Sequence, residues 1–292
     1  MLRRPAAPLV VALGSALATT VVWLVAFQTG AGARLDSTAL GGFMGLSDSR
    51  VEPLAAAAAH LADPIPFAVL ALALVSVALV RHRPRHALVV AMVLAGANVT
   101  TQLLKPLATA PRPAEAPPFA SLPGAWPSGH TTAAMTLALC LVVVAPARWR
   151  PLAAAAGGMY AVAEAYGLLV MGWHYPSDVV GAFGVATVWL ALGVAALRMT
   201  TGRTEESRLR GPRVFAPAAG TALAGAALAA ATLLLRPGGA AVYAQEHTTF
   251  VAAAVVLGAA GLALVAVTAA ALQLIEHGAP GHDRGGPAPR RT

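Results

Sequence analysis

Long apolar stretches alternate with short polar segments along the whole chain. Because a bilayer core of about 30 Å requires about 20 apolar residues per helix, each stretch is a candidate transmembrane helix. The candidates cover about residues 7–28, 64–80, 87–104, 131–147, 152–172, 179–197, 214–235 and 247–274. The pattern therefore predicts an all-α fold, a polytopic bundle of transmembrane helices.

Basic residues in the polar segments predict the orientation of this bundle. With the N-terminus in the cytoplasm, the inside segments contain Arg3, Arg4, Arg81, Arg83, Arg85, Arg148, Arg150, Arg198, Arg203, Arg208, Arg210, Arg213, Arg284, Arg290 and Arg291. The outside segments contain only Arg34, Arg50, Lys105, Arg112 and Arg236. Because cytoplasmic loops of membrane proteins are enriched in Lys and Arg, this asymmetry predicts a multi-pass protein of the cell membrane with a cytoplasmic N-terminus.

Composition agrees with a membrane protein, since 58% of the residues are hydrophobic and 11% are charged, whereas soluble domains carry about a quarter charged residues. The net charge of +8 comes from arginines clustered between apolar runs, a distribution that disfavours nucleic-acid binding. We expect a six-span unit with two additional C-terminal helices, divided into a unit at 1–200, a basic cytoplasmic linker at 201–213, two further spans within 214–274 and a disordered basic tail at 275–292.

The outside segment at 29–63 is the longest, and its Ala-rich part at 53–62 is expected to form a short helix lying on the membrane interface. Asn98 and Gln102 are expected to make hydrogen bonds between helices. Trp173 and Tyr175 are expected in the aromatic belt at the interface.

Three outside segments carry most of the unusual polar residues, at 105–113, 127–130 and 173–178. Lys105 is the only lysine in a chain that otherwise uses arginine, which suggests a specific demand for an ammonium group. Together with Arg112 it supplies the fixed positive charge that phosphoryl transfer needs around the equatorial oxygens. Ser128 and Gly129 stand where a helix begins, so backbone N–H groups there can approach an anion.

Two histidines and one carboxylate complete this chemistry. Imidazole can act both as a nucleophile and as a proton donor, so one of His130 and His174 can attack phosphorus while the other donates a proton. Asp178 follows His174 by one helical turn and can fix the tautomer of its imidazole. The only cysteine, Cys140, lies in an apolar run, which excludes an intramolecular disulfide and a cysteine-based metal site.

The order Lys-x6-Arg-Pro, Pro-Ser-Gly-His and His-x3-Asp resembles the type 2 phosphatidic acid phosphatase family of membrane lipid phosphatases, over about residues 100–180. The resemblance implies hydrolysis of a lipid phosphate through a phosphohistidine, with neither a metal nor another cofactor, and the charge asymmetry predicts that the site lies at the outer membrane face. The partners that the resemblance implies are a lipid phosphate substrate and the surrounding membrane lipids. It also implies roles for the residues of the three motifs: His174 as nucleophile, Asp178 as its partner, His130 as proton donor, and Lys105, Arg112, Ser128 and Gly129 as phosphate ligands.

The third motif departs from the family pattern. That motif usually begins Ser-Arg, with the arginine six residues before the nucleophile, and this chain has Gly167 and Leu168 at those positions. Loss of one charged hydrogen bond to phosphate costs about 1.5–3 kcal/mol. An alternative hypothesis is therefore a catalytically degenerate protein that binds a lipid phosphate without hydrolysing it. A third is a transporter, for which the intramembrane Glu164 would be the relay, although no internal repeat favours it.

Overall fold

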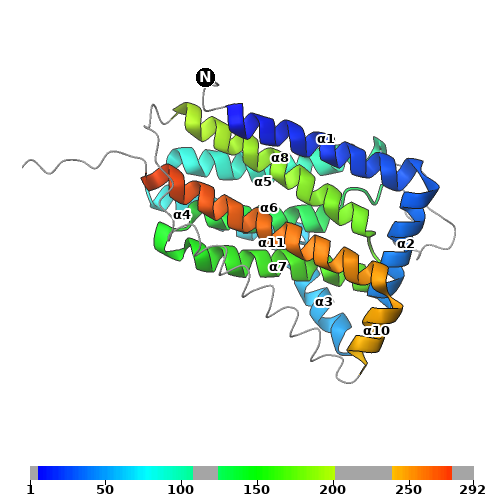
Figure 1. Cartoon of the computed structure of the whole chain (residues 1–292). Helices are drawn as coiled ribbons and strands as arrows, with labels where there is room; N and C mark the ends of the chain where they lie inside the picture. The colour runs from blue at the N-terminus through cyan, green and yellow to red at the C-terminus, as the bar shows by residue number, and fades with distance from the viewer. Residues whose placement is uncertain (1–5, 108–123, 201–238, 278–292) are drawn as a thin grey trace, which may run out of the picture.

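The fold is a bundle of long α-helices, seen in a computed structural model that describes residues 6–107, 124–200 and 239–277 (Figure 1). The α-helices are α1 Ala6–Gln28, α2 Gly30–Met44, α3 Val51–His60, α4 Pro64–Val80, α5 Pro84–Leu104, α6 Gly129–Val144, α7 Arg150–Val170, α8 Pro176–Thr200, α10 Ala240–Glu246 and α11 Thr248–His277. Short 3₁₀ helices follow α5, at Lys105–Leu107, and precede α7, at Ala147–Trp149. Among the described residues there is no strand, so the predicted all-α class is confirmed.

Five of these helices, α1, α5, α7 (with the 3₁₀ turn before it), α8 and α11, are long and apolar enough to cross a membrane. α3 and α4 together form a sixth candidate, bent by 55° at the break between them. These helices confirm the polytopic bundle that the hydropathy pattern predicts. The predicted span at 214–235, the linker at 201–213 and most of the tail lie outside the described residues.

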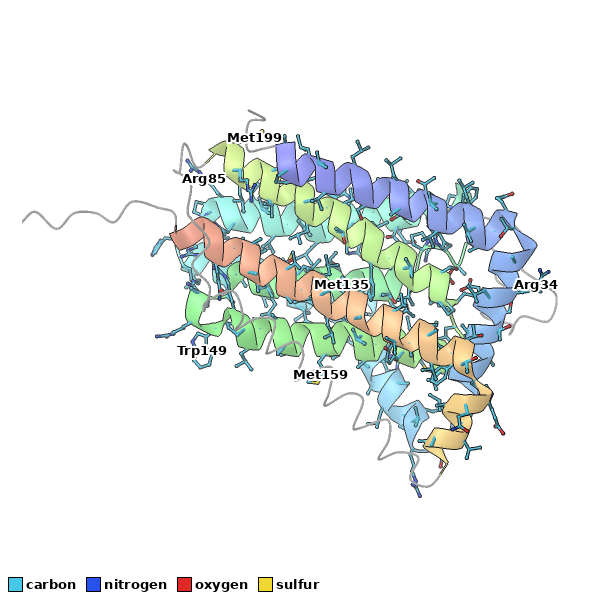
Figure 2. All side chains as sticks on the ribbon, in the orientation of Figure 1. Arg34, Arg85, Met135, Trp149, Met159 and Met199 are labelled. Carbon is cyan, nitrogen blue, oxygen red and sulfur yellow. The ribbon has the colours of Figure 1, made fainter. Side chains whose placement is uncertain are left out.

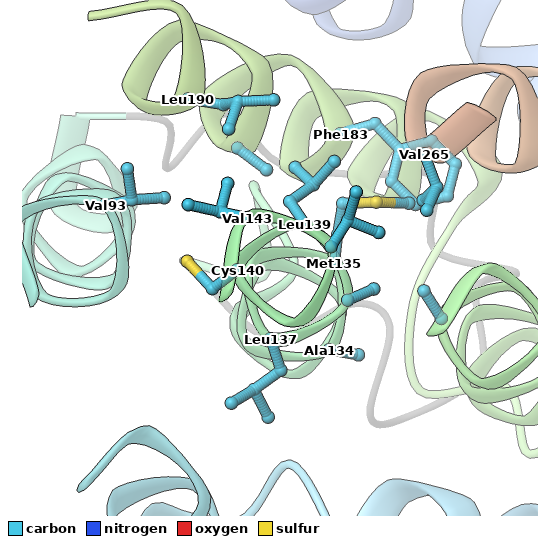
Figure 3. Close-up of a cluster of buried hydrophobic side chains, with 14 of the residues drawn as sticks. Val93, Ala134, Met135, Leu137, Leu139, Cys140, Val143, Phe183, Leu190 and Val265 are labelled. Carbon is cyan, nitrogen blue, oxygen red and sulfur yellow. The ribbon is translucent and has the colours of Figure 1, made fainter. Parts of the chain in front are cut away.

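Helix α6 is the centre of the bundle, and most of its residues are buried. Figure 3 shows its side chains packed among Val93 of α5, Phe183 and Leu190 of α8, and Val265 of α11. With 16 residues it is shorter than a standard span. Because no water solvates backbone groups inside a bilayer, helices satisfy those groups internally, and side chains of neighbouring helices fill the remaining volume.

Small residues set the separation of the helices. A Cβ atom on Gly157 of α7 would stand 3.1 Å from Cα and Cβ of Ala138 on α6. α11 packs against α7 in the same way, since a Cβ on Gly158 would meet Leu262 at 3.1 Å. Close approach at such positions is the usual source of packing energy between helices in lipid.

The two ends of the bundle differ. α2, α3 and α10 lie together at one end (Figure 1), where Figure 2 shows Arg34, whereas Arg85, Trp149 and Met199 lie at the opposite end. The predicted helix within 53–62 exists as α3, and one side of it packs on α7. Ala55 is buried against α7, where a Cβ on Gly167 would meet it at 3.1 Å, because small residues on both helices allow tight packing.

Gly157 supplies a direct test of this packing. Replacement Gly157→Val would push α7 away from α6, and overpacking of this kind costs about 1–3 kcal/mol. We expect a lower midpoint of thermal unfolding in detergent. Gly14→Val on α1 is the matched control, since a Cβ there meets nothing within 4 Å. Equal loss of stability in the two variants would contradict the packing account.

Candidate active site

The second and third motifs meet at one end of α6 and α8. The N–H group of Ser128 donates to the carbonyl oxygen of Asp178 at 3.1 Å, which ties the start of α6 to the first turn of α8. The rings of His130 and Trp173 lie 6.2 Å apart between centroids. Residues 128–130 and 173–178 are thus brought together as the sequence pattern predicts.

His174 and Asp178 form the pair that the spacing predicts. Nδ1 of His174 lies 3.2 Å from Oδ2 of Asp178, whose side chain is fully buried. The same Oδ2 accepts the N–H group of Tyr175 at 2.9 Å. A carboxylate that engages Nδ1 leaves Nε2 of the imidazole with its lone pair, which is the form needed for nucleophilic attack.

A sharp turn between α7 and α8 presents His174. α7 ends in a Schellman motif, in which the N–H groups of Trp173 and Gly172 donate to the carbonyls of Leu168 at 2.9 Å and Leu169 at 3.1 Å. Gly172 has φ +67°, a conformation that glycine adopts without steric cost. The chain then re-enters a helix at Pro176, where a missing N–H group costs nothing.

The start of α8 is held by two carboxylates. Asp178 binds back to the N–H group of Tyr175, as the acid of a capping box does. Asp36 of α2 accepts the N–H group of Ser177 at 2.9 Å and its hydroxyl at 2.5 Å. Tyr175 is 1% exposed, so its expected place in the interface belt is wrong; the turn places it in the core.

Ser128 caps α6. Its hydroxyl accepts the N–H group of Thr131 at 3.3 Å, and the residue is fully buried. The N–H groups of Gly129 and His130 belong to the same first turn, where a helix has no acceptors of its own. This turn therefore presents donors and the positive end of the helix dipole to an anion.

Lys105 lies beside this turn. Its Nζ is 3.6 Å from the position that a Cβ on Gly129 would occupy, and Nε2 of Gln102 is 3.7 Å from the same point. The hydroxyls of Thr101 and Thr132, 3.1 Å apart, join the end of α5 to α6. The first motif thus meets the second through Lys105. Arg112 lies outside the described residues.

Of the two amide residues on α5, Asn98 departs from its expected role and Gln102 does not. Gln102 reaches the glycine of the second motif and adds an amide donor to the candidate phosphate site. Asn98 donates to the carbonyl of Leu94 in its own helix at 2.8 Å, so the prediction of a bond between helices is wrong for that residue. The amide is satisfied locally because the carbonyl one turn back is within its reach.

His130 has a partner that the motif pattern does not contain. Its Nε2 lies 3.0 Å from Oδ1 of Asp63, the residue just before α4. Oδ2 of Asp63 lies 2.8 Å from Nδ1 of His60. Hydrogen bonds from His60 and then from His130 lower the pKa of the Asp63 carboxyl below its ordinary value.

The sequence carried no signal for either Asp36 or Asp63 as site residues. Each is distant in sequence from the side chain that it contacts, and neither belongs to a motif. An aspartate just before a helix that begins with proline reads as an ordinary N-cap.

The position of the absent arginine is filled by an apolar side chain. Leu168 is fully buried in the last turn of α7, six residues before His174. Glu164, one turn earlier, is also fully buried. Among the described residues, no three His, Cys, Asp or Glu side chains are arranged to hold a metal ion.

The arrangement can perform phosphoryl transfer. It places an oriented imidazole, a second imidazole and a turn of backbone donors with an ammonium group at one end of the bundle. Groups of these kinds can act as a nucleophile, a proton donor and an anion site.

The segment that contains these groups resembles a known protein family. Residues 86–202 match the family model described as the PAP2 superfamily. No curated protein and no solved structure gave a significant match. This match over residues 86–202 is consistent with the resemblance of the motifs to type 2 phosphatidic acid phosphatases.

Proposed function

We propose that this protein hydrolyses phosphate or diphosphate esters of lipids through a phosphohistidine formed on His174. The PAP2 domain and the apolar helices support a membrane phosphatase in general. The observation that carries the finer proposal is the contact of the buried Asp178 with Nδ1 of His174, in a turn tied to the start of α6. Candidate substrates are polyprenyl diphosphates, phosphatidic acid and phosphatidylglycerol phosphate.

The proposed reaction has two halves. Nε2 of His174 forms a bond to phosphorus, the ester P–O bond breaks, and His130 gives its proton to the leaving oxygen. Water then attacks the phosphohistidine, its proton goes to His130, and the P–N bond breaks with its electron pair returning to His174. Lys105, Gly129 and the N-terminus of α6 stabilise the charge on the equatorial oxygens, with Ser128 and Arg112 as the remaining phosphate ligands.

We also propose that the site faces outward from the cell membrane. Arg85 lies at the end of the bundle opposite Arg34, as the charge asymmetry predicts (Figure 2). A site at the membrane surface suits an amphiphile whose head group contacts Lys105 while its tail remains in lipid. The proposed organisation keeps the boundaries expected from the sequence, with a phosphatase unit at 1–200, a linker at 201–213, two spans within 214–274 and a tail at 275–292.

Phosphate release from a panel of lipid phosphates tests the function. The purified protein in detergent should release phosphate from at least one of them, and His174→Ala should reduce the rate by about three orders of magnitude or more, since no other group replaces the nucleophile. His86→Ala, at the start of α5, is the matched control and should retain the wild-type rate. A wild-type protein that releases no phosphate from any substrate would contradict the phosphatase proposal.

The alternative function is a binding protein for lipid phosphates, and the buried Leu168 favours it. Restoring the charge separates the two functions. We expect Leu168→Arg to raise kcat/KM about tenfold, because one charged hydrogen bond to phosphate is worth about 1.5–3 kcal/mol. Leu169→Arg is the matched control, because it buries a guanidinium at the next position of α7. Binding retained without turnover, in both the wild type and Leu168→Arg, would favour the binding protein instead.

A further inference from the structure

Asp63 occupies the position of a helix cap without acting as one. It stands at the 55° bend between α3 and α4, and its side chain makes no capping hydrogen bond. Pro64 and Pro66 have no N–H group, so Ile65 is the only one of the first three helical residues that could donate to a cap. The carboxylate is left to the two imidazoles, at 2.8 Å from His60 and 3.0 Å from His130.

Several charged or titratable groups surround the start of α6. They are Asp63 and His60 beside α4, Lys105 after α5, Glu164 on α7, and His174 and Asp178 at the start of α8. Among the described residues, only Asp63 makes a hydrogen bond with the imidazole of His130. The side chains of His130 and Asp63 are 31% and 40% exposed, so the pair lies at the open rim of the site.

The two histidines are held through opposite nitrogens. Asp178 engages Nδ1 of His174, whereas Asp63 engages Nε2 of His130. A carboxylate that accepts from one ring nitrogen fixes the orientation of the ring and stabilises its cationic form. The imidazole of His174 is cationic after it attacks phosphorus, so a carboxylate stabilises its product state. The imidazole of His130 is cationic before it gives up its proton, so a carboxylate stabilises its starting state.

We propose that Asp63 is a positioning residue for His130, holding Nε2 so that Nδ1 delivers the proton to the leaving oxygen. This rests on the proposed function. Nδ1 of His130 loses its proton as the P–O bond breaks, and regains it from the water that attacks phosphorus. The carboxylate of Asp63 stays ionised throughout and exchanges no proton.

A comparison of leaving groups tests this role. A lipid monophosphate such as phosphatidic acid expels a strongly basic alkoxide and needs the proton, whereas p-nitrophenyl phosphate expels a weakly basic phenolate that does not. We expect Asp63→Asn to lower kcat/KM, which reports on the steps up to cleavage of the P–O bond, about a hundredfold on the lipid and less than about threefold on the aryl ester. The ratio of the two rates cancels any loss of folded protein, because both are measured on one preparation.

Three further variants sharpen the test. Asp63→Glu keeps the charge and should recover part of the lipid rate. Asp63→Asn in a His130→Ala background should change neither rate more than about threefold, because the group that Asp63 positions is absent. Asp48→Asn is the matched control, since that carboxylate accepts from the N–H groups of Arg50 and Val51 and should keep the wild-type ratio.

The outcomes distinguish failure of the role proposed for Asp63 from failure of the proposed phosphatase function. Equal losses on both substrates in Asp63→Asn, with a fully active wild type, would overturn the role of Asp63 and leave the phosphatase intact. A wild type inactive on both substrates would overturn the proposed function, and the role of Asp63 with it.

Discussion

One hydrogen bond between backbone groups, from the N–H of Ser128 to the carbonyl of Asp178, sets the register of the candidate site. It joins the first turns of α6 and α8, two helices whose side chains also pack on one another further along. With that register fixed, Asp178 on α8 and the first turn of α6 lie at one depth in the bundle. The contact of Thr101 with Thr132 brings the end of α5, and with it Lys105, to the same depth.

Residues proposed to take part in the chemistry also cap the N-termini of the helices. Asp178 binds the N–H group of Tyr175 and the imidazole of His174 with one oxygen atom, so the carboxylate that starts α8 also orients the nucleophile. Ser128 caps α6 where an anion would bind. Because a bilayer interior allows no unpaired backbone groups, the ends of the helices are where polar side chains gather, and a site built there is held rigid by the fold itself.

Much of this could be predicted from the sequence because its signals are local. Apolar stretches of helical length predict the spans, and His174 with Asp178 follows from a spacing of one turn. Contacts between distant segments carry no such signal, which is why Asp36, Asp63 and the proximity of Gln102 to Gly129 emerge only from the structure. The packing of α3 on α7 is another such contact, since an Ala-rich stretch does not reveal which helix covers its small residues.

The central claim is that phosphate passes through His174, and trapping the phosphorylated protein measures it most directly. The protein would be denatured in alkali during turnover of a lipid carrying radioactive phosphorus, then digested, and the labelled peptide identified. The account predicts an acid-labile, alkali-stable label on His174 that is absent from His174→Ala. A label on any other residue, with turnover intact, would contradict it.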